Sequence, residues 1–88
     1  MEDKYWCPRG HFNEDQFKLF QGLVSGIKPR FALETGFCTG RSAFSVLKNT
    51  GEMKKMISID INFDYMKPEG RIYQKLLTDD FSIFSTIE

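Results

Sequence analysis

Apolar residues recur at intervals of three or four in the first third of the chain. The set is Phe17, Phe20, Val24 and Ile27. This spacing is typical of an amphipathic helix. Asn13 is a suitable N-cap in front of it, and the acids that follow suit the positive end of the helix dipole. Because Pro29 stops the pattern, the sequence predicts a helix over residues 13–27, after an irregular lead-in over residues 1–12.

Two short apolar runs follow, and each ends in an acidic residue. Residues 31–34 (Phe-Ala-Leu-Glu) end in Glu34, and residues 56–60 (Met-Ile-Ser-Ile-Asp) end in Asp60. Runs of this length between turn residues are typical of buried strands. Between them, residues 41–49 carry the apolar positions of a helix that ends at an Asn-Thr-Gly sequence.

The last third of the chain has a less regular pattern. Residues 62–70 contain a proline and a glycine, which predicts a loop with at most one helical turn. Residues 71–78 fit a strand or a helix, and we favour a third strand. The two acids at 79–80 are then expected to cap a final helix over residues 81–87.

The predicted order is helix, strand, helix, strand, loop, strand, helix. Strands that are separated by helices pair in parallel, which gives an α/β layer structure. We expect about three strands, and right-handed crossovers place them in the spatial order 3-2-1. We therefore expect one α/β domain over residues 1–88, with a parallel sheet and flanking helices.

Composition narrows the class of protein. The 88 residues are 41% apolar and 27% charged, which is typical of one small globular domain. Twelve basic and twelve acidic residues cancel, so no net charge attracts nucleic acid or an anionic membrane. No apolar run approaches the roughly 20 residues of a membrane-spanning helix. The polar N-terminus also lacks the apolar core of a signal peptide, so we expect a cytoplasmic protein.

The residues that most often bind metals are few and scattered. They are Cys7, Cys38 and His11. No Cys-x-x-Cys pair exists and the histidine has no second histidine beside it, so we predict no metal site. Without a secretion signal, a structural disulfide is not expected either. His11 is expected to be an ordinary surface residue, and the alternative is a base or a contact with a ligand.

The main candidate chemistry lies between the first strand and the helix after it. Glu34 is followed by glycines at positions 36 and 40. Gly36 can adopt a positive φ and lets a ligand approach the backbone closely, and Gly40 stands where the helix begins to pack against the strand. The free N–H groups at the start of that helix would face the ligand. The acid would accept hydrogen bonds or pair with a cationic group.

Two nucleotide-binding patterns fit this turn poorly. Residues 36–42 (Gly-Phe-Cys-Thr-Gly-Arg-Ser) are one residue too short for a phosphate-binding P-loop, and Arg41 replaces its lysine. A dinucleotide fingerprint needs a glycine where Cys38 stands, although Asp60 lies at a suitable distance. Arg41 itself is either an exposed helix residue or a contact for a cofactor carboxylate.

A third pattern fits the turn better. The segment Leu33–Ala43 resembles motif I of class I S-adenosylmethionine-dependent methyltransferases, and it looks closest to their small-molecule O-methyltransferase-like branch. Residues 57–60 (Ile-Ser-Ile-Asp) resemble the second-strand motif of that family. The resemblance covers residues 30–80 and implies a truncated Rossmann-like fold with S-adenosylmethionine as cofactor. The sequence departs from the family at Cys38, where many members have glycine.

The resemblance implies a set of cofactor-binding residues and no catalytic one. Glu34 would lie near the methionine part of the cofactor, and Asp60 would accept both ribose hydroxyls with its two oxygens. Ile61 would lie against the adenine, and Asp79 or Asp80 would meet the adenine amino group. The full set is Glu34, Gly36, Phe37, Gly40, Asp60, Ile61 and Asp79.

The predicted elements stop near a third strand, whereas methyl transfer in that family is organised beyond a fourth. No segment is left for a wall that binds the methyl acceptor, and Phe81 and Phe84 hint at packing partners elsewhere. We therefore expect a truncated or split enzyme that is active only when further chain or a partner completes it. The alternative is a non-catalytic nucleotide-binding or scaffolding module that associates through its open sheet edge, as a homodimer or with a complementing chain. A phosphate-binding nucleotidase relative is the third hypothesis.

Overall fold

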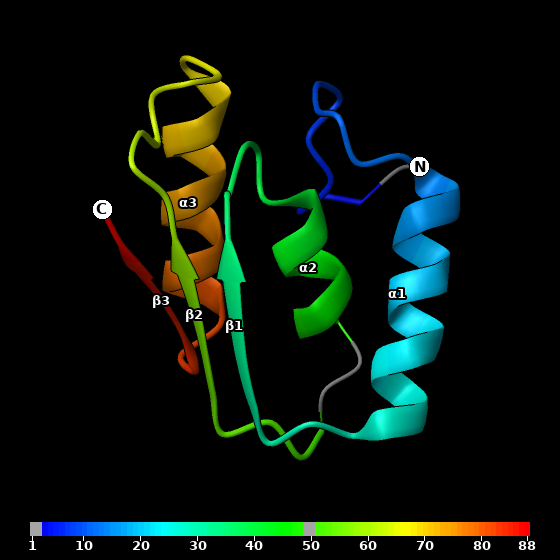
Figure 1. Ribbon diagram of the computed structural model, residues 1–88. Helices are drawn as coiled ribbons and strands as arrows, with labels where there is room; N and C mark the ends of the chain where they lie inside the picture. The colour runs from blue at the N-terminus through cyan, green and yellow to red at the C-terminus, as the bar shows by residue number, and fades with distance from the viewer. Residues whose placement is uncertain (1–2, 49–50) are drawn as a thin grey trace.

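The computed structural model describes residues 3–48 and 51–88, which form a three-stranded parallel sheet with helices beside it (Figure 1). The elements in chain order are α1 (Glu14–Ile27), β1 (Phe31–Thr35), α2 (Arg41–Leu47), β2 (Lys55–Ile59), α3 (Glu69–Asp80) and β3 (Phe84–Ile87). The strands lie in the order β1-β2-β3, and both pairs are parallel. The predicted α/β fold and strand order are confirmed, and the arrangement is that of a truncated Rossmann-like sheet.

The first four elements fall where the sequence predicts them, within a residue or two at the ends that the structure describes. At the start of α1, the Asn13 side chain accepts a hydrogen bond from the Gln16 N–H, and the Gln16 side chain accepts one from the Asn13 N–H, both at 2.9 Å. This reciprocal pair is a capping box. Lys28 follows the helix in the left-handed conformation, with φ 54°. The predicted end of α2 at 49–50 lies outside the described residues.

The prediction for the last third of the chain is wrong. Residues 69–80 form α3 where a loop and a third strand were expected, and residues 84–87 form β3 where a final helix was expected. Good helix formers such as Gln, Lys and Leu dominate α3, and its buried residues, Gly70 and Leu77, lie two turns apart. The segment after it is rich in aromatic and β-branched residues, which favours a strand.

The sheet has one covered face and one open face. Right-handed crossovers in a single direction place α2 and α3 on the same face, where Met56, Ser58 and Phe84 are buried. On the other face, Phe31 and Leu33 are 69% and 66% exposed. Parallel sheets are ordinarily covered on both faces, so this open apolar face is an unusual feature of the chain.

Aromatic rings fill much of the core on the covered face. Phe84 is buried and stacks on Phe37, with ring centroids 6.2 Å apart. Phe81 packs edge-on against Tyr5 at 5.1 Å. The phenylalanines near the end of the chain therefore have packing partners within this domain, contrary to the hint from the sequence.

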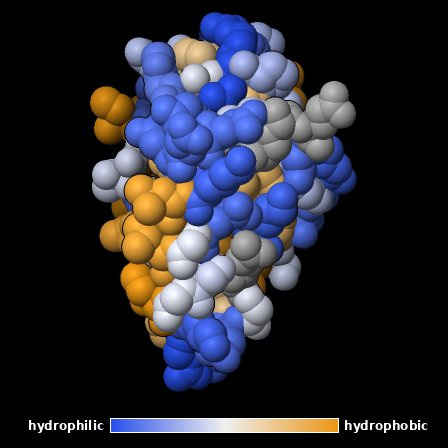
Figure 2. All heavy atoms as spheres, turned by 90° about the vertical axis from the view of Figure 1, so that its right-hand side faces the viewer, coloured by the Kyte–Doolittle hydropathy of each residue, from blue (hydrophilic) through white to orange (hydrophobic). Residues whose placement is uncertain are grey.

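α1 packs against α2 and carries apolar side chains on its outer side. Leu19, Leu23 and Ile27 follow one another at intervals of one helical turn and are all more than half exposed. Figure 2, which views the α1 side of the molecule, shows apolar side chains gathered among hydrophilic ones. Within the described residues, no helix is both long enough and apolar enough to cross a membrane.

Candidate functional site

Each strand of the sheet has an acidic residue at or just after its carboxyl end. Glu34 lies in β1, Asp60 directly follows β2, and Glu88 directly follows β3. The glycine turn follows β1 at the same edge, and Gly36 and Gly40 have φ values of 85° and 81°. The carboxyl edge of an open α/β sheet is where ligands of such folds bind, so this edge is the candidate site.

Hydrogen bonds to Asp60 connect the glycine turn to the end of β2. Its carboxylate accepts hydrogen bonds from the N–H groups of Phe37, at 2.7 Å, and Asn62, at 2.9 Å. Partial burial pushes the pKa of Asp60 upward, but hydrogen bonds from the backbone of four neighbouring residues outweigh it and hold this pKa below its usual value. Asp60 therefore carries a negative charge at neutral pH, directly beside the turn.

Glu34 lies deeper, on the covered face of β1. Its two carboxylate oxygens accept hydrogen bonds from the hydroxyls of Ser58, at 2.7 Å, and Ser42, at 2.9 Å. Burial raises the pKa of Glu34 above its usual value, the serine hydroxyls oppose this, and the charge of Asp60 adds to it. Among the described residues, no lysine or arginine pairs with this carboxylate, so it can still accept hydrogen bonds from a cationic group.

Two adjoining hollows flank the glycine turn. The β2 hollow is lined by His11, Gly36, Cys38, Asp60, Ile61, Asn62 and Tyr65. The α2 hollow is lined by His11, Phe12, Gln16, Gly36, Phe37, Cys38, Thr39, Arg41 and Ser42. The two share three residues at the turn and the lead-in, so together they form one crevice that runs from Asp60 across Gly36 to the start of α2.

The structure brings most of the predicted site residues to this crevice, but in different ways. Ile61 is 96% exposed and lines the β2 hollow together with Gly36 and Asp60. Phe37 lies in the core with a side chain that is only 1% exposed, so its backbone is the part that faces the turn. Gly40 is a packing residue, because a Cβ there would lie 2.8 Å from the side chains of Leu77 and Phe37.

The expectation that Asp79 ends a strand is wrong. Asp79 lies in the last turn of α3 and forms an ion pair with Lys75 at 2.8 Å. Because α3 runs antiparallel to the strands, this end of the helix lies at the opposite edge of the sheet from the crevice (Figure 1). Asp80 is held there as well, by the Nζ of Lys4 at 2.9 Å.

The acid that does follow the third strand is Glu88, which sequence reasoning missed. The Arg71 guanidinium donates hydrogen bonds to both of its carboxylate oxygens, at 2.9 and 2.7 Å. The signal for this acid was present, because residues 84–88 repeat the pattern of a short strand followed by an acid. The prediction of a helix over the same residues hid it.

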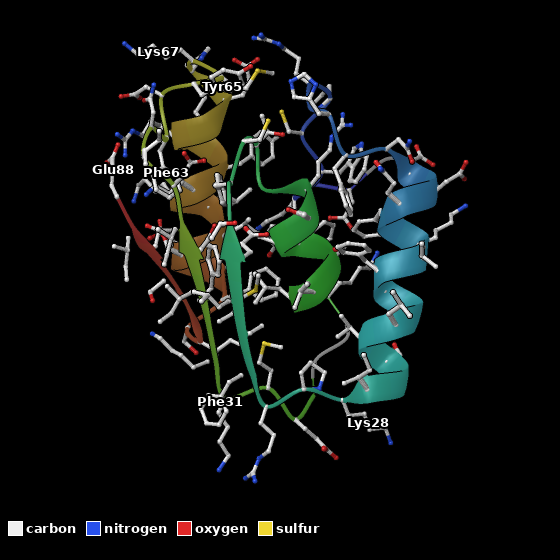
Figure 3. All side chains as sticks on the ribbon, viewed as in Figure 1. Lys28, Phe31, Phe63, Tyr65, Lys67 and Glu88 are labelled. Carbon is white, nitrogen blue, oxygen red and sulfur yellow. The ribbon has the colours of Figure 1, made fainter. Side chains whose placement is uncertain are left out.

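Two further residues of the crevice had no local signal in the sequence. His11, expected at the surface, is exposed and lines both hollows. Tyr65 is 68% exposed and lines the β2 hollow, on the loop that precedes α3 (Figure 3). Both come from irregular segments that only the tertiary fold brings to the sheet edge.

Arg41 faces the lead-in. Its guanidinium donates hydrogen bonds to the carbonyl oxygens of Cys7, at 2.9 and 2.7 Å, Gly10, at 3.3 Å, and Phe12, at 2.9 Å. It also lies over the Trp6 ring, 4.2 Å from the ring centroid. The guanidinium therefore holds the lead-in against α2, and its donors are largely used for that purpose.

No protein-family model and no curated protein matches this sequence. Among solved structures, the chain is similar to the crystal structure of cofactor-bound Rv0187 from MTB, with a TM-score of 0.69 and 18% sequence identity. The likeness covers 94% of this chain and 37% of that chain, so the chain spans a little over a third of that structure's length. At this identity the likeness concerns the fold, and it agrees with the Rossmann-like α/β arrangement described above.

Proposed function

We propose that this chain binds S-adenosylmethionine in the crevice at the carboxyl edge of the sheet, as the cofactor-binding part of a small-molecule O-methyltransferase-type protein. The observation that carries the proposal is the meeting of Asp60, Gly36 and Ile61 in one hollow. The likeness to a cofactor-bound structure supports a cofactor site. The choice of cofactor depends on the acid-glycine-acid arrangement and on the sequence resemblance.

The residues of the β2 hollow suit the adenosine part of this cofactor. Two carboxylate oxygens on Asp60 can accept hydrogen bonds from two neighbouring ribose hydroxyls. Ile61 presents an exposed apolar side chain against which an adenine ring can pack, and Tyr65 lies on the same hollow. Above Gly36, at φ 85°, a Cβ would meet no atom within 4 Å, so the backbone there is open to a ligand.

Methyl transfer itself is proposed only for a completed enzyme. When bound, the cofactor would supply an electrophilic methyl group, and the enzyme would have to hold the acceptor in line with it. No residue of this chain is assigned as a catalytic base. We infer that the wall for the methyl acceptor comes from further polypeptide, because the chain matches only 37% of the similar structure.

Calorimetric titration tests the cofactor. The purified chain is titrated with S-adenosylmethionine, S-adenosylhomocysteine, NAD and ATP with magnesium. We expect saturable binding of the first two ligands, weakened in Asp60→Asn and in Ile61→Ala. Ile61 is almost fully exposed, so its truncation should leave the thermal midpoint unchanged. Asp79→Asn is the matched control, because it converts an acid to an amide at the opposite edge of the sheet.

Two results would argue against the proposal. Tight binding of ATP with magnesium, equal in the wild type and in Asp60→Asn, would favour a phosphate-binding nucleotidase relative. No binding of any of the four ligands would leave a non-catalytic scaffolding module as the better hypothesis.

The second hypothesis, association through the sheet, is favoured by the open face. Its exposed apolar side chains include Phe31 and Leu33 of β1 and Ile87 of β3, and a shallow, mainly apolar hollow lies over β1 and β2. β1 is also an edge strand of the sheet. Exposed apolar surface of this kind marks interaction sites, so we propose that a second copy or a complementing chain covers this face.

Sedimentation velocity tests this association. A homodimer should dissociate in Leu33→Lys, which places a charge among the exposed apolar side chains of the open face. Ile72→Lys adds the same charge to an exposed position on α3 and should leave the assembly unchanged. A wild-type chain that stays monomeric at every concentration would exclude the homodimer.

A further inference from the structure

The lead-in forms one wall of the crevice, and side-chain hydrogen bonds hold it in place. Beside the hydrogen bonds from Arg41, the buried hydroxyl of Thr39 donates to the carbonyl oxygen of Arg9 at 2.8 Å. The approach is close, since a Cβ on Gly10 would lie 2.7 Å from the Thr39 hydroxyl and 2.8 Å from the Arg41 side chain. The glycine turn and the start of α2 therefore fix the backbone on both sides of His11.

His11 is held at the junction of the two hollows, where it lines both. A ligand whose ribose lies on Asp60 and which crosses Gly36 ends in the α2 hollow. The part of S-adenosylmethionine that would reach this end is its amino acid, with one amino group and one carboxylate. His11 would therefore lie beside that end of the ligand.

The side chains of the α2 hollow differ in what they can still donate. Arg41 and His11 are the two lining residues whose side chains can be cationic. The Arg41 guanidinium is engaged by lead-in carbonyls, and the Ser42 hydroxyl donates to Glu34. An imidazole donates an N–H in its neutral and its charged form, so His11 is the donor best suited to a carboxylate here.

We propose that His11 is a specificity-determining residue that recognises the carboxylate of the cofactor's amino-acid end. The inference builds on the proposed function. Glu34 lines neither hollow, but it accepts a hydrogen bond from Ser42, which lines the α2 hollow, and it is the acceptor that suits the amino group. One acceptor and one donor at this end of the crevice then match the two charges of an amino acid.

Two ligands that differ only in the carboxylate test the role of His11. One is S-adenosylhomocysteine, and the other is its decarboxylated analogue, which keeps the adenosine, the thioether and the amine. His11→Ala should weaken the first about tenfold to a hundredfold, as expected for a lost hydrogen bond to a charged group, and leave the second unchanged. His11→Gln keeps an N–H donor and should recover part of the affinity.

Lys54→Ala is the control, because it removes an exposed cation that lines neither hollow. Thermal midpoints of all variants should equal that of the wild type, since His11 and Lys54 are both exposed. Equal weakening of both ligands by His11→Ala, or no weakening of either, would overturn the role of His11 while the proposed function stands. A wild type that binds neither ligand would overturn both.

Discussion

The backbone N–H of Phe37 donates a hydrogen bond to the Asp60 carboxylate at 2.7 Å, which joins the glycine turn after β1 to the end of β2. The Phe37 ring packs beneath the turn, 5.3 Å from the ring of Phe63. One residue therefore anchors the turn through its backbone on one side and through its side chain on the other. The acid proposed to bind the ribose also holds the turn over which the ligand passes.

Asp60→Asn should lower stability as well as affinity. The amide keeps one oxygen that can accept a hydrogen bond, but its NH₂ group cannot accept the second backbone N–H. We expect the free energy of unfolding to fall by roughly 1.5–3 kcal/mol, the usual range for a hydrogen bond to a charged acceptor. Urea unfolding at neutral pH measures this.

The control for that measurement is Asp79→Asn. This variant disrupts only the exposed ion pair between Asp79 and Lys75, which lie one helical turn apart. Ion pairs as exposed as this one contribute little to stability. Equal losses in the two variants would show that the bonds from Asp60 to the turn add little to stability. Titrations of Asp60→Asn should be carried out well below its unfolding midpoint, so that lost binding is not lost folding.

Gly70→Ala should destabilise the fold, although alanine is the better helix former. A Cβ at this position would clash with the carbonyl oxygen of Phe63 and lie 3.1 Å from that of Cys38. The start of α3 would have to move away from the glycine turn. We expect a loss of about 1–3 kcal/mol, as for other overpacked sites, measured by chemical unfolding.

Gly22→Ala is the matched comparison for Gly70. It lies inside α1, and a Cβ there would meet nothing within 4 Å. Alanine should therefore stabilise the protein by up to about 1 kcal/mol. If both alanine variants were stabilising, the close approach of α3 to the turn would not be a constraint on the fold.

The sequence predicted the first two-thirds of the fold because local signals and tertiary packing agree there. Asn13 caps α1 as its residue type suggests, and Glu34 and Asp60 end strands that are apolar on their own. In α3 the two kinds of signal conflict. Ile72 and Thr78 favour a strand locally, whereas the burial of Gly70 and Leu77 two turns apart becomes evident only in the fold.

The residues of the candidate site fall into the same two groups, those with a local sequence signal and those that only the fold brings to the site. Asp60, Gly36 and Ile61 stand within or next to recognisable motifs, so the sequence located them. His11 reaches the crevice only because Arg41 and Thr39 donate hydrogen bonds to carbonyl oxygens of the lead-in. The donor and acceptor residues are more than 25 positions apart in the sequence. Such long-range hydrogen bonds have no local pattern, and the sequence therefore suggested an ordinary surface histidine.

Cys38→Gly should preserve or raise stability. Cys38 has φ 55°, a left-handed conformation that L-residues adopt at a cost of about 1–2 kcal/mol. Glycine removes that strain, and its greater freedom in the unfolded chain offsets roughly 0.4–1 kcal/mol of the gain. We expect Cys38→Gly to be about 1 kcal/mol more stable than Cys38→Ala, which keeps the strain. Equal stability of the two in urea would show that the backbone strain at this position is no larger than the entropic cost of glycine.

Glu34→Gln should remove a pH dependence of stability. Because burial raises the pKa of Glu34 in the folded state, the folded chain holds this proton more tightly than the unfolded chain does. Stability therefore falls as pH rises from the ordinary glutamate pKa of about 4.3 to the folded value, and the loss is complete above it. The variant should match the wild type near pH 4 and exceed it at neutral pH, in unfolding curves recorded across this range. Asp64→Asn should show the opposite behaviour. The hydrogen bond that Arg71 donates to Asp64 lowers the pKa of this carboxyl in the folded state. The Asp64→Asn variant should therefore be less stable than the wild type at neutral pH and equally stable in acid. A Glu34→Gln curve parallel to the wild type at every pH would show that the folded chain does not hold a proton on Glu34 more tightly.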